Sequence, residues 1–221
     1  MINSLKSEEE TIIEFSNFHK QNGAVTSLKN FAQWGYKENY PIITEPIANV
    51  LSKILDIHKP ENILEIGLCI GYSASFMASK PYVSKVTSID RAEKFIKIAR
   101  ENIESLNLTK KIEIIYADAA YELQNQVSEN KKYDLIFLDA AKAQYINFLP
   151  FILKLLKKGG ILLADNISQK GLLELSYDKI EKRQRTIYNN MKKFITAINI
   201  EPSLHSTIAE IGDGLSVSIK N

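Results

Sequence analysis

Oxygen-bearing side chains follow two short apolar runs in the second half of the chain. Asp139 follows Leu135–Leu138, and Asp165 and Asn166 follow Ile161–Ala164. If both runs are neighbouring parallel strands, their carboxyl ends share one edge of a sheet, and the three side chains converge there. Two carboxylates and an amide are hard oxygen ligands that leave room for water and substrate, which Mg²⁺ prefers. The sequence therefore predicts a magnesium site at Asp139, Asp165 and Asn166.

The side chains that bind zinc stand elsewhere in the sequence. His19, His58 and His205 are far from the two acidic runs, and the single cysteine, Cys69, lies in a glycine turn, so zinc is disfavoured. A lone cysteine allows no internal disulfide, and we find neither a secretory signal pattern nor an apolar stretch long enough for a membrane span. These features predict a cytoplasmic protein with no membrane partner.

That glycine turn, Gly67–Gly71, follows the apolar run Asn62–Ile66 and is a candidate cofactor site. Glycine at the end of a first strand lets the backbone approach a ligand, and Asp90 ends the next run, where a carboxylate can bind ribose hydroxyls. The dinucleotide fingerprint is incomplete because Cys69 and Tyr72 replace its second and third glycines. A nicotinamide dinucleotide is therefore disfavoured.

Acidic residues at three successive strand ends favour a cofactor without phosphate. Glu65 stands just before the glycine turn, where a carboxylate would repel phosphate and suit an ammonium group, and Asp118 follows the third run, where it could bind an adenine edge. S-adenosylmethionine carries a ribose, an ammonium and a sulfonium and has no phosphate. We therefore expect S-adenosylmethionine as the cofactor.

The apolar runs alternate with segments whose apolar residues have helical spacing. Strands are expected at Asn62–Ile66, Lys85–Ile89, Ile112–Tyr116, Leu135–Leu138 and Ile161–Ala164, with Gly159 and Gly160 making the turn into the fifth. Ser206–Ile211 and Leu215–Ile219 flank a Gly-Asp-Gly turn and predict an antiparallel pair. The fold class is therefore α/β, with a Rossmann-like, doubly wound, mostly parallel seven-stranded sheet that ends in an antiparallel hairpin. Residues 1–40, which are polar with interspersed aromatics, predict an N-terminal helical extension or cap.

The motifs ILEIGLCIGYSA, YDLIFLDAAKAQY and LLADN together resemble those of the cation-dependent O-methyltransferases. That family includes catechol, caffeoyl-coenzyme-A and bacterial tRNA 5-hydroxyuridine enzymes, and the similarity covers roughly residues 40–219. It implies an S-adenosylmethionine-dependent methyltransferase domain over residues 41–221, with Mg²⁺ as a second cofactor. Because relatives dimerise, it also implies a homodimer.

The resemblance also assigns roles to individual residues. Lys142, which follows Asp139, resembles the general base that removes the proton of the acceptor hydroxyl. The implied cofactor contacts are Ile43, Glu65, Gly67, Ser73, Asp90, Asp118, Ala119 and Asp139. Ile43 and Leu68 depart from the residues usual in relatives, which affects the contacts expected at the methionine moiety.

Charge helps to choose between the acceptors that such a metal site permits. Catechols and 5-hydroxyuracil both present adjacent oxygens, so site chemistry cannot separate them. Between residues 170 and 193, seven Lys and Arg oppose three acids, and the run KIEKRQR is similar to the bacterial tRNA enzymes. Phosphates dominate the affinity for nucleic acid, so we expect this segment to bind a tRNA anticodon loop, and no DNA, through Lys170, Lys182, Arg183 and Arg185. The product would be 5-methoxyuridine at the wobble position.

Three other interpretations remain open from the sequence. An O-methyltransferase for small catechol-like or phenylpropanoid substrates would need no basic segment, which would then be only a solvated helix face. An NAD-linked oxidoreductase is disfavoured by the incomplete fingerprint. A non-catalytic RNA-binding module is disfavoured because Asp139, Lys142, Asp165 and Asn166 are all present.

Overall fold

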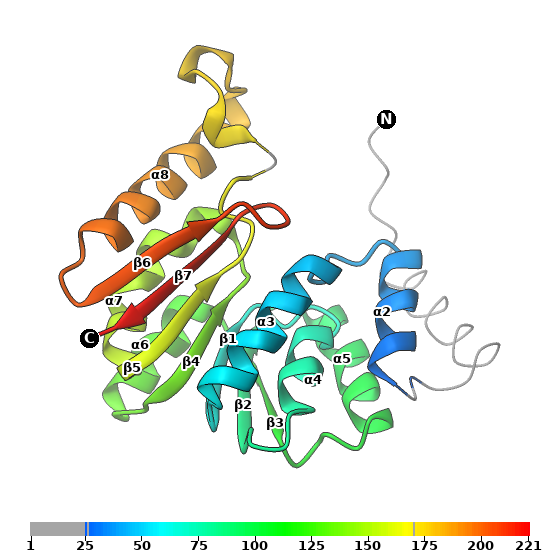
Figure 1. Ribbon diagram of the computed structural model, residues 1–221. Coiled ribbons are helices and arrows are strands. Elements are labelled where there is room, and N and C mark those ends of the chain that lie inside the picture. Colours follow the sequence, from blue (N-terminus) through cyan, green and yellow to red (C-terminus); the bar gives the residue numbers. More distant parts are fainter. Residues whose placement is uncertain (1–24, 26, 170) are drawn as a thin grey trace.

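The computed structural model describes residue 25, residues 27–169 and residues 171–221, and it contains one seven-stranded sheet (Figure 1). The strands are β1 (Asn62–Ile66), β2 (Lys85–Asp90), β3 (Ile112–Tyr116), β4 (Tyr133–Leu138), β5 (Leu156–Ala164), β6 (Leu204–Ala209) and β7 (Leu215–Lys220). Their order is β3-β2-β1-β4-β5-β7-β6, and only the pairs that involve β7 are antiparallel. The predicted fold class is confirmed.

Helices cover both faces of the sheet (Figure 1). The first face carries α2 (Leu28–Lys37), α3 (Glu45–His58), α4 (Tyr72–Ala78) and α5 (Glu93–Ser105), and the second carries α6 (Ala119–Ser128), α7 (Tyr145–Leu155) and α8 (Arg185–Ile200). Short 3₁₀ turns lie at η1 (Lys142–Gln144), η2 (Leu172–Glu174), η3 (Tyr177–Lys179) and η4 (Lys182–Gln184). Among the described helices, none is both long and apolar enough to cross a bilayer.

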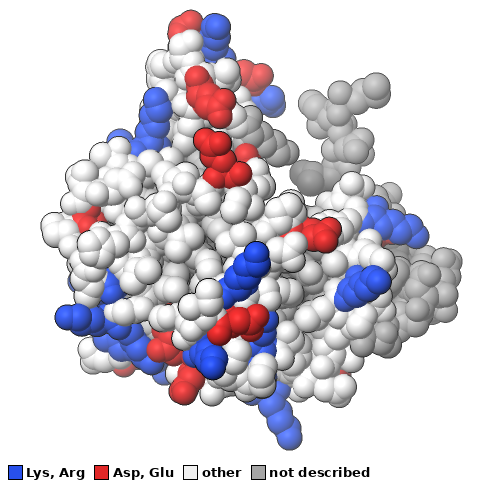
Figure 2. Space-filling model, in the orientation of Figure 1, with Lys and Arg blue, Asp and Glu red and all other residues white. Residues whose placement is uncertain are grey.

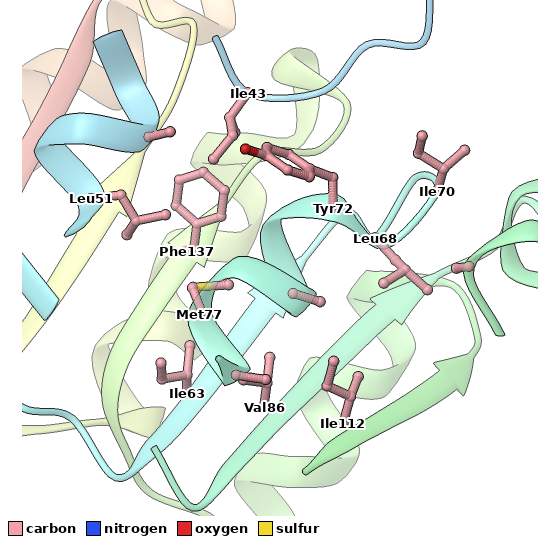
Figure 3. Packing of buried hydrophobic residues seen from close by; sticks show 14 of the residues in the cluster. Ile43, Leu51, Ile63, Leu68, Ile70, Tyr72, Met77, Val86, Ile112 and Phe137 are labelled. Atoms are coloured by element: carbon pink, nitrogen blue, oxygen red, sulfur yellow. The ribbon is translucent and has the colours of Figure 1, made fainter. Parts of the chain in front are cut away.

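Strand residues alternate between the two cores because neighbouring side chains of a strand point to opposite faces. Ile63, Val86 and Ile112 come from three adjacent strands and lie beneath Met77 of α4, as Figure 3 shows. On the opposite face, Leu138 packs in the second core with residues of α7 and α8. A sheet buried on both sides is what parallel strands with crossover helices require.

Two turn predictions differ from the structure. Gly159 and Gly160 lie inside β5 and make no turn before it, because β5 begins directly after α7, at Leu156. The register of its pairing with β4 shifts between Tyr133 and Leu135. The extra residues of β5 form an irregularity near the amino end of this strand pair. The β6–β7 loop spans residues 210–214 and is therefore longer than the predicted three-residue turn.

The N-terminal extension can be followed only from residue 25, with residue 26 also outside the described part of the chain. In α2, Phe31 and Trp34 are buried, and the Phe31 ring packs edge-to-face on Tyr72 at 5.3 Å between centroids. The described part of the extension therefore packs beside α4.

Gly67→Ala and Gly159→Ala should destabilise the fold to very different degrees. Both glycines have a positive φ, +105° and +76°, which costs an alanine about 1–2 kcal/mol. A Cβ at Gly67 would also stand 2.0 Å from the carbonyl oxygen of Asp139, whereas a Cβ at Gly159 meets nothing within 4 Å. We expect Gly67→Ala to lower the free energy of unfolding by roughly 4 kcal/mol or more, and Gly159→Ala by about 1 kcal/mol, in urea titrations. Equal losses would contradict a close approach of β1 to β4.

Candidate active site

A cavity of about 1030 Å³ lies at the carboxyl ends of the parallel strands. Its wall is formed by residues 41–44 before α3, by the loops that follow β1 to β5, by the β6–β7 loop and by part of the segment between β5 and α8. Ligands of open α/β sheets bind in this place. The volume is at the upper end of the range for small-molecule sites, so a cofactor and part of an acceptor can share the cavity.

The predicted site residues are mostly brought together in this cavity. Its lining includes Ile43, Gly67, Ser73, Asp90, Asp118, Ala119, Asp139, Lys142, Asp165 and Asn166. Glu65, Lys182, Arg183 and Arg185 do not line it, and Lys170 lies outside the described residues. The roles assigned to these residues stay predictions, but ten of them share one cavity.

The glycine turn is needed for packing between helices as well as for the approach of a ligand to the backbone. A Cβ at Gly71 would meet the Cβ of Ala99 at 3.2 Å, so this glycine allows α4 and α5 to approach. The amides of Leu68 and Cys69 donate to Asp90 Oδ2 at 2.9 and 3.0 Å, which fixes the turn against the end of β2. Asp90 therefore holds the turn while it also faces the cavity.

Glu65 is fully buried beneath the glycine turn. Its two carboxylate oxygens accept hydrogen bonds from the hydroxyls of Ser73 and Ser88. Burial raises the pKa of Glu65 to about 8, the two hydroxyls oppose that rise, and the charges of Asp139 and Asp90 add to it. Glu65 is therefore connected to the cavity through Ser73, and the contact with the ammonium of a cofactor expected for Glu65 stays a prediction.

Asp139 and Asp165 form the acidic end of the cavity. Asp165 is 2% exposed, its Oδ1 accepts from the amide of Asn166 at 2.7 Å, and Asn166 has a left-handed backbone with φ +54°. Burial first, and then the charge of Asp139, raises the pKa of Asp165 to about 6. In the described part of the chain, no three His, Cys, Asp or Glu gather around one point. Asn166, the third residue predicted to hold a metal, lines the same cavity.

Lys142 stands at the same end of the cavity. Its ammonium lies 2.6 Å from Asp139 Oδ1 and 2.8 Å from the hydroxyl of Tyr145. The lysine side chain is only 15% exposed, so its Nζ has little conformational freedom. Such a restrained amine beside two acids can exchange a proton with a bound hydroxyl.

Of the predicted RNA-binding residues that the structure describes, Lys182 and Arg183 lie on the segment that projects beyond α8, and Arg185 is the first residue of α8 (Figure 1). Arg183 pairs with Glu181 at 2.7 Å, and Arg185 donates to the carbonyl of Ile180 at 3.2 Å and stacks on Tyr177 at 5.0 Å. Between residues 171 and 185, four basic residues oppose three acids, and both colours appear on the projection in Figure 2. The projection is therefore less uniformly basic than the whole segment 170–193.

Sequence reasoning missed several residues of the cavity wall. Leu172, Leu175 and Gln184 come from the projecting segment, whose consecutive 3₁₀ turns have no helical or strand period to reveal them, and Ile187 lies in the first turn of α8. Asp213 also lines the cavity, although its place between two glycines predicted only a turn. An acid at a hairpin tip was the one available signal.

Comparisons with known proteins fit this geometry. A family model described as O-methyltransferase matches residues 20–221. A candidate caffeoyl-CoA O-methyltransferase of Arabidopsis thaliana is 28% identical over 218 residues, which cover 96% of this chain and 94% of that protein. A candidate caffeoyl-CoA O-methyltransferase structure from Staphylococcus aureus has a TM-score of 0.81 and 27% identity, covering 96% of this chain and 100% of that one. A Bacillus cereus O-methyltransferase, solved in complex with SAH, has a TM-score of 0.76 and 25% identity, covering 97% and 100%.

Glu65 should make the fold less stable as pH rises. Its folded pKa of about 8 exceeds the ordinary 4.5, so the folded chain holds a proton that the unfolded chain releases between those values. The stabilisation is complete below pH 4.5 and is lost as pH rises through 8, a change of roughly 3–5 kcal/mol. Glu65→Gln should show a much smaller loss between pH 5 and 9 in urea unfolding. The exposed Glu104→Gln is the control, and a wild-type-like pH profile for Glu65→Gln would contradict a protonated Glu65.

Proposed function

Because this chain belongs to the O-methyltransferase family, we propose that it transfers a methyl group from S-adenosylmethionine to a hydroxyl held in the cavity. The observation that carries the proposal is the shared cavity of Asp90, Ser73, Asp139, Lys142 and Asp165. The relative from Bacillus cereus was solved in complex with SAH, the form of this cofactor that has lost its methyl group.

The cofactor would lie along the glycine turn. Asp90 accepts the two turn amides at Oδ2 and the amide of Ala92 at Oδ1, which leaves Oδ1 one lone pair for a ribose hydroxyl, and Ser73 offers a hydroxyl to the amino-acid portion. Asp118 is the N-cap of α6, where its side chain accepts from the amide of Ala120 at 2.9 Å, and would lie at the adenine end of the bound cofactor. No phosphate-binding glycine cradle is needed for this ligand.

We propose Mg²⁺ as the second cofactor, held by Asp139, Asp165 and Asn166. The charge of Asp139 adds to the raised pKa of the buried Asp165, so a divalent cation between the two carboxylates would relieve their repulsion, and the pair is a fitting donor set. When bound, the ion would lower the pKa of the acceptor hydroxyl and fix it beside a neighbouring oxygen.

Lys142 is proposed to take the proton of the acceptor hydroxyl. Its amine, in the neutral form, accepts that proton while the oxygen–carbon bond forms and the carbon–sulfur bond of the cofactor breaks. Asp139 and the Tyr145 hydroxyl hold Nζ at 2.6 and 2.8 Å, so the amine is positioned before the acceptor arrives. Holding the reacting groups in place supplies part of the rate.

Asp165→Asn should abolish most methyl transfer without weakening cofactor binding. The substitution keeps the shape of the side chain and removes one of two carboxylates for Mg²⁺, so we expect kcat to fall roughly 100-fold or more. The dissociation constant for S-adenosylmethionine, measured by calorimetry, should change less than about threefold because Asp165 lies away from the glycine turn. EDTA should reproduce the effect in the wild type, and the exposed Asp178→Asn should behave as wild type. Full activity of Asp165→Asn in EDTA would contradict the metal site.

We further propose that the acceptor is 5-hydroxyuridine at the wobble position of tRNA. Gln184 and Ile187, which line the cavity, stand on either side of Arg185 in the sequence, so we expect the basic residues to lie near the cavity mouth. Phosphates of an anticodon loop would meet Lys182, Arg183 and Arg185 while an unstacked base enters the cavity. The homodimer expected from the resemblance stays a prediction.

A small catechol-like or phenylpropanoid acceptor is the second candidate. The names of the relatives from Arabidopsis thaliana and Staphylococcus aureus favour it. Such an acceptor would use the same acidic end of the cavity and would not depend on the projecting segment.

Removing two cations near the start of α8 should separate the two acceptors. Lys182→Ala, Arg183→Ala and Arg185→Lys keep a cation for the contact between Arg185 and Tyr177 and lower the charge by two. We expect the KM for tRNA that carries 5-hydroxyuridine to rise about tenfold or more at 0.15 M salt, with unchanged turnover of a free catechol. The control is Lys131→Ala with Lys132→Ala, which removes the same charge at the amino end of β4. Methylation of catechol alone, with no transfer to the tRNA, would favour the second candidate.

A further inference from the structure

The geometry points to Tyr145 as a positioning residue that holds Lys142 and ties together the ends of β4 and β5. This inference rests on the proposed methyl transfer and concerns how its base and metal ligands are held. The Tyr145 hydroxyl accepts a hydrogen bond from Lys142 Nζ at 2.8 Å. It lies 2.9 Å from the carbonyl oxygen of Leu138 and 3.2 Å from that of Asp165.

One hydroxyl thus connects three groups that must keep fixed distances. Leu138 directly precedes Asp139, so one carbonyl acceptor belongs to the strand end that carries the first proposed metal ligand. The other acceptor is the carbonyl of Asp165, which is itself a proposed ligand. A hydroxyl has one proton and donates to one carbonyl at a time, so the two strand ends share it.

The environment of Tyr145 is otherwise suited to a phenylalanine. The side chain is fully buried, and its ring packs edge-to-face on Phe194 of α8 at 5.4 Å between centroids. Asn190 of the same helix donates to the carbonyl of Ala143 at 2.8 Å, so the η1 loop has a second anchor. Burying a hydroxyl is costly unless it is hydrogen-bonded, and packing alone would not require it. The hydroxyl's own task is therefore its contacts with Lys142 and the two carbonyls.

Lys142 Nζ is held between two oxygens, Asp139 Oδ1 and the Tyr145 hydroxyl. Without the hydroxyl, Nζ keeps one tether and the long side chain gains rotamers. A shift of about 1 Å in a reacting group costs up to roughly 100-fold in rate. Loss of a group that orients metal ligands costs about tenfold or more in metal affinity.

The test compares Tyr145→Phe with Tyr133→Phe. Tyr133 is also buried and bonded through its hydroxyl, to Gln126 at 2.9 Å, but it lies at the opposite end of β4. For Tyr145→Phe we expect kcat to fall at least tenfold, Mg²⁺ affinity measured by calorimetry to fall about tenfold, and the KM for S-adenosylmethionine to stay within about twofold. At saturating Mg²⁺ in the Lys142→Ala background, Tyr145→Phe should lower kcat less than about threefold, because the part of its effect that passes through the lysine is already lost. Tyr133→Phe should leave each of these quantities unchanged.

Unchanged Mg²⁺ affinity in Tyr145→Phe would overturn the inference, as would an equal loss of kcat in the presence and absence of Lys142. A wild-type protein that methylates neither tRNA nor catechol would instead contradict the proposed function. In that case the Mg²⁺ affinities of the two tyrosine variants still decide the positioning role, since they need no turnover.

Discussion

The site depends on backbone pairing that continues one residue beyond each parallel strand. The amide of Gly67 donates to Ile89, that of Asp139 to Ile66 and that of Asp165 to Leu138, at 2.9, 2.9 and 3.1 Å. Each bond fixes a cavity residue to the neighbouring strand before its side chain makes any contact. The relative positions of Asp139 and Asp165 therefore follow from the β1, β4 and β5 ladder, which is buried in two apolar cores.

The acidic side chains that this ladder brings together repel one another, and each of them has different neighbours that offset the repulsion. Glu65 is buried with two hydroxyls and a raised pKa, which favours its neutral form. Asp90 is held by backbone amides, and Asp139 is paired with Lys142. Asp165 accepts one backbone amide and lies near the carboxylate of Asp139, so a bound cation would stabilise its charged form. A cationic cofactor and a divalent ion are the ligands that such an unequal set favours.

The sequence predicted the site residues that stand at strand ends. It did not predict the contacts that depend on packing between different elements. Asp139 and Asp165 could be predicted to converge because parallel strands share an edge, and the structure places them in one cavity. The surroundings of Glu65 could not be predicted, since Ser88 comes from another strand and its direction depends on register. The position of Gly160 within β5 depends on a local shift against β4 that no sequence period marks. Leu175 and Gln184 were missed because the 3₁₀ turns before α8 carry no apolar repeat.

Helix α8 connects the two parts of the cavity that the sequence suggested separately. Its first turn carries Arg185 and contributes Ile187 to the cavity wall, next to the projecting segment. Its middle braces the η1 loop, where Asn190 holds the carbonyl of Ala143 and Phe194 packs on Tyr145. Helix α8 thus lines the proposed entrance of the acceptor and also packs against the loop that carries Lys142, the proposed base. A rigid helix transmits such a constraint without any change of fold, so the acceptor's surroundings and the base share one structural support.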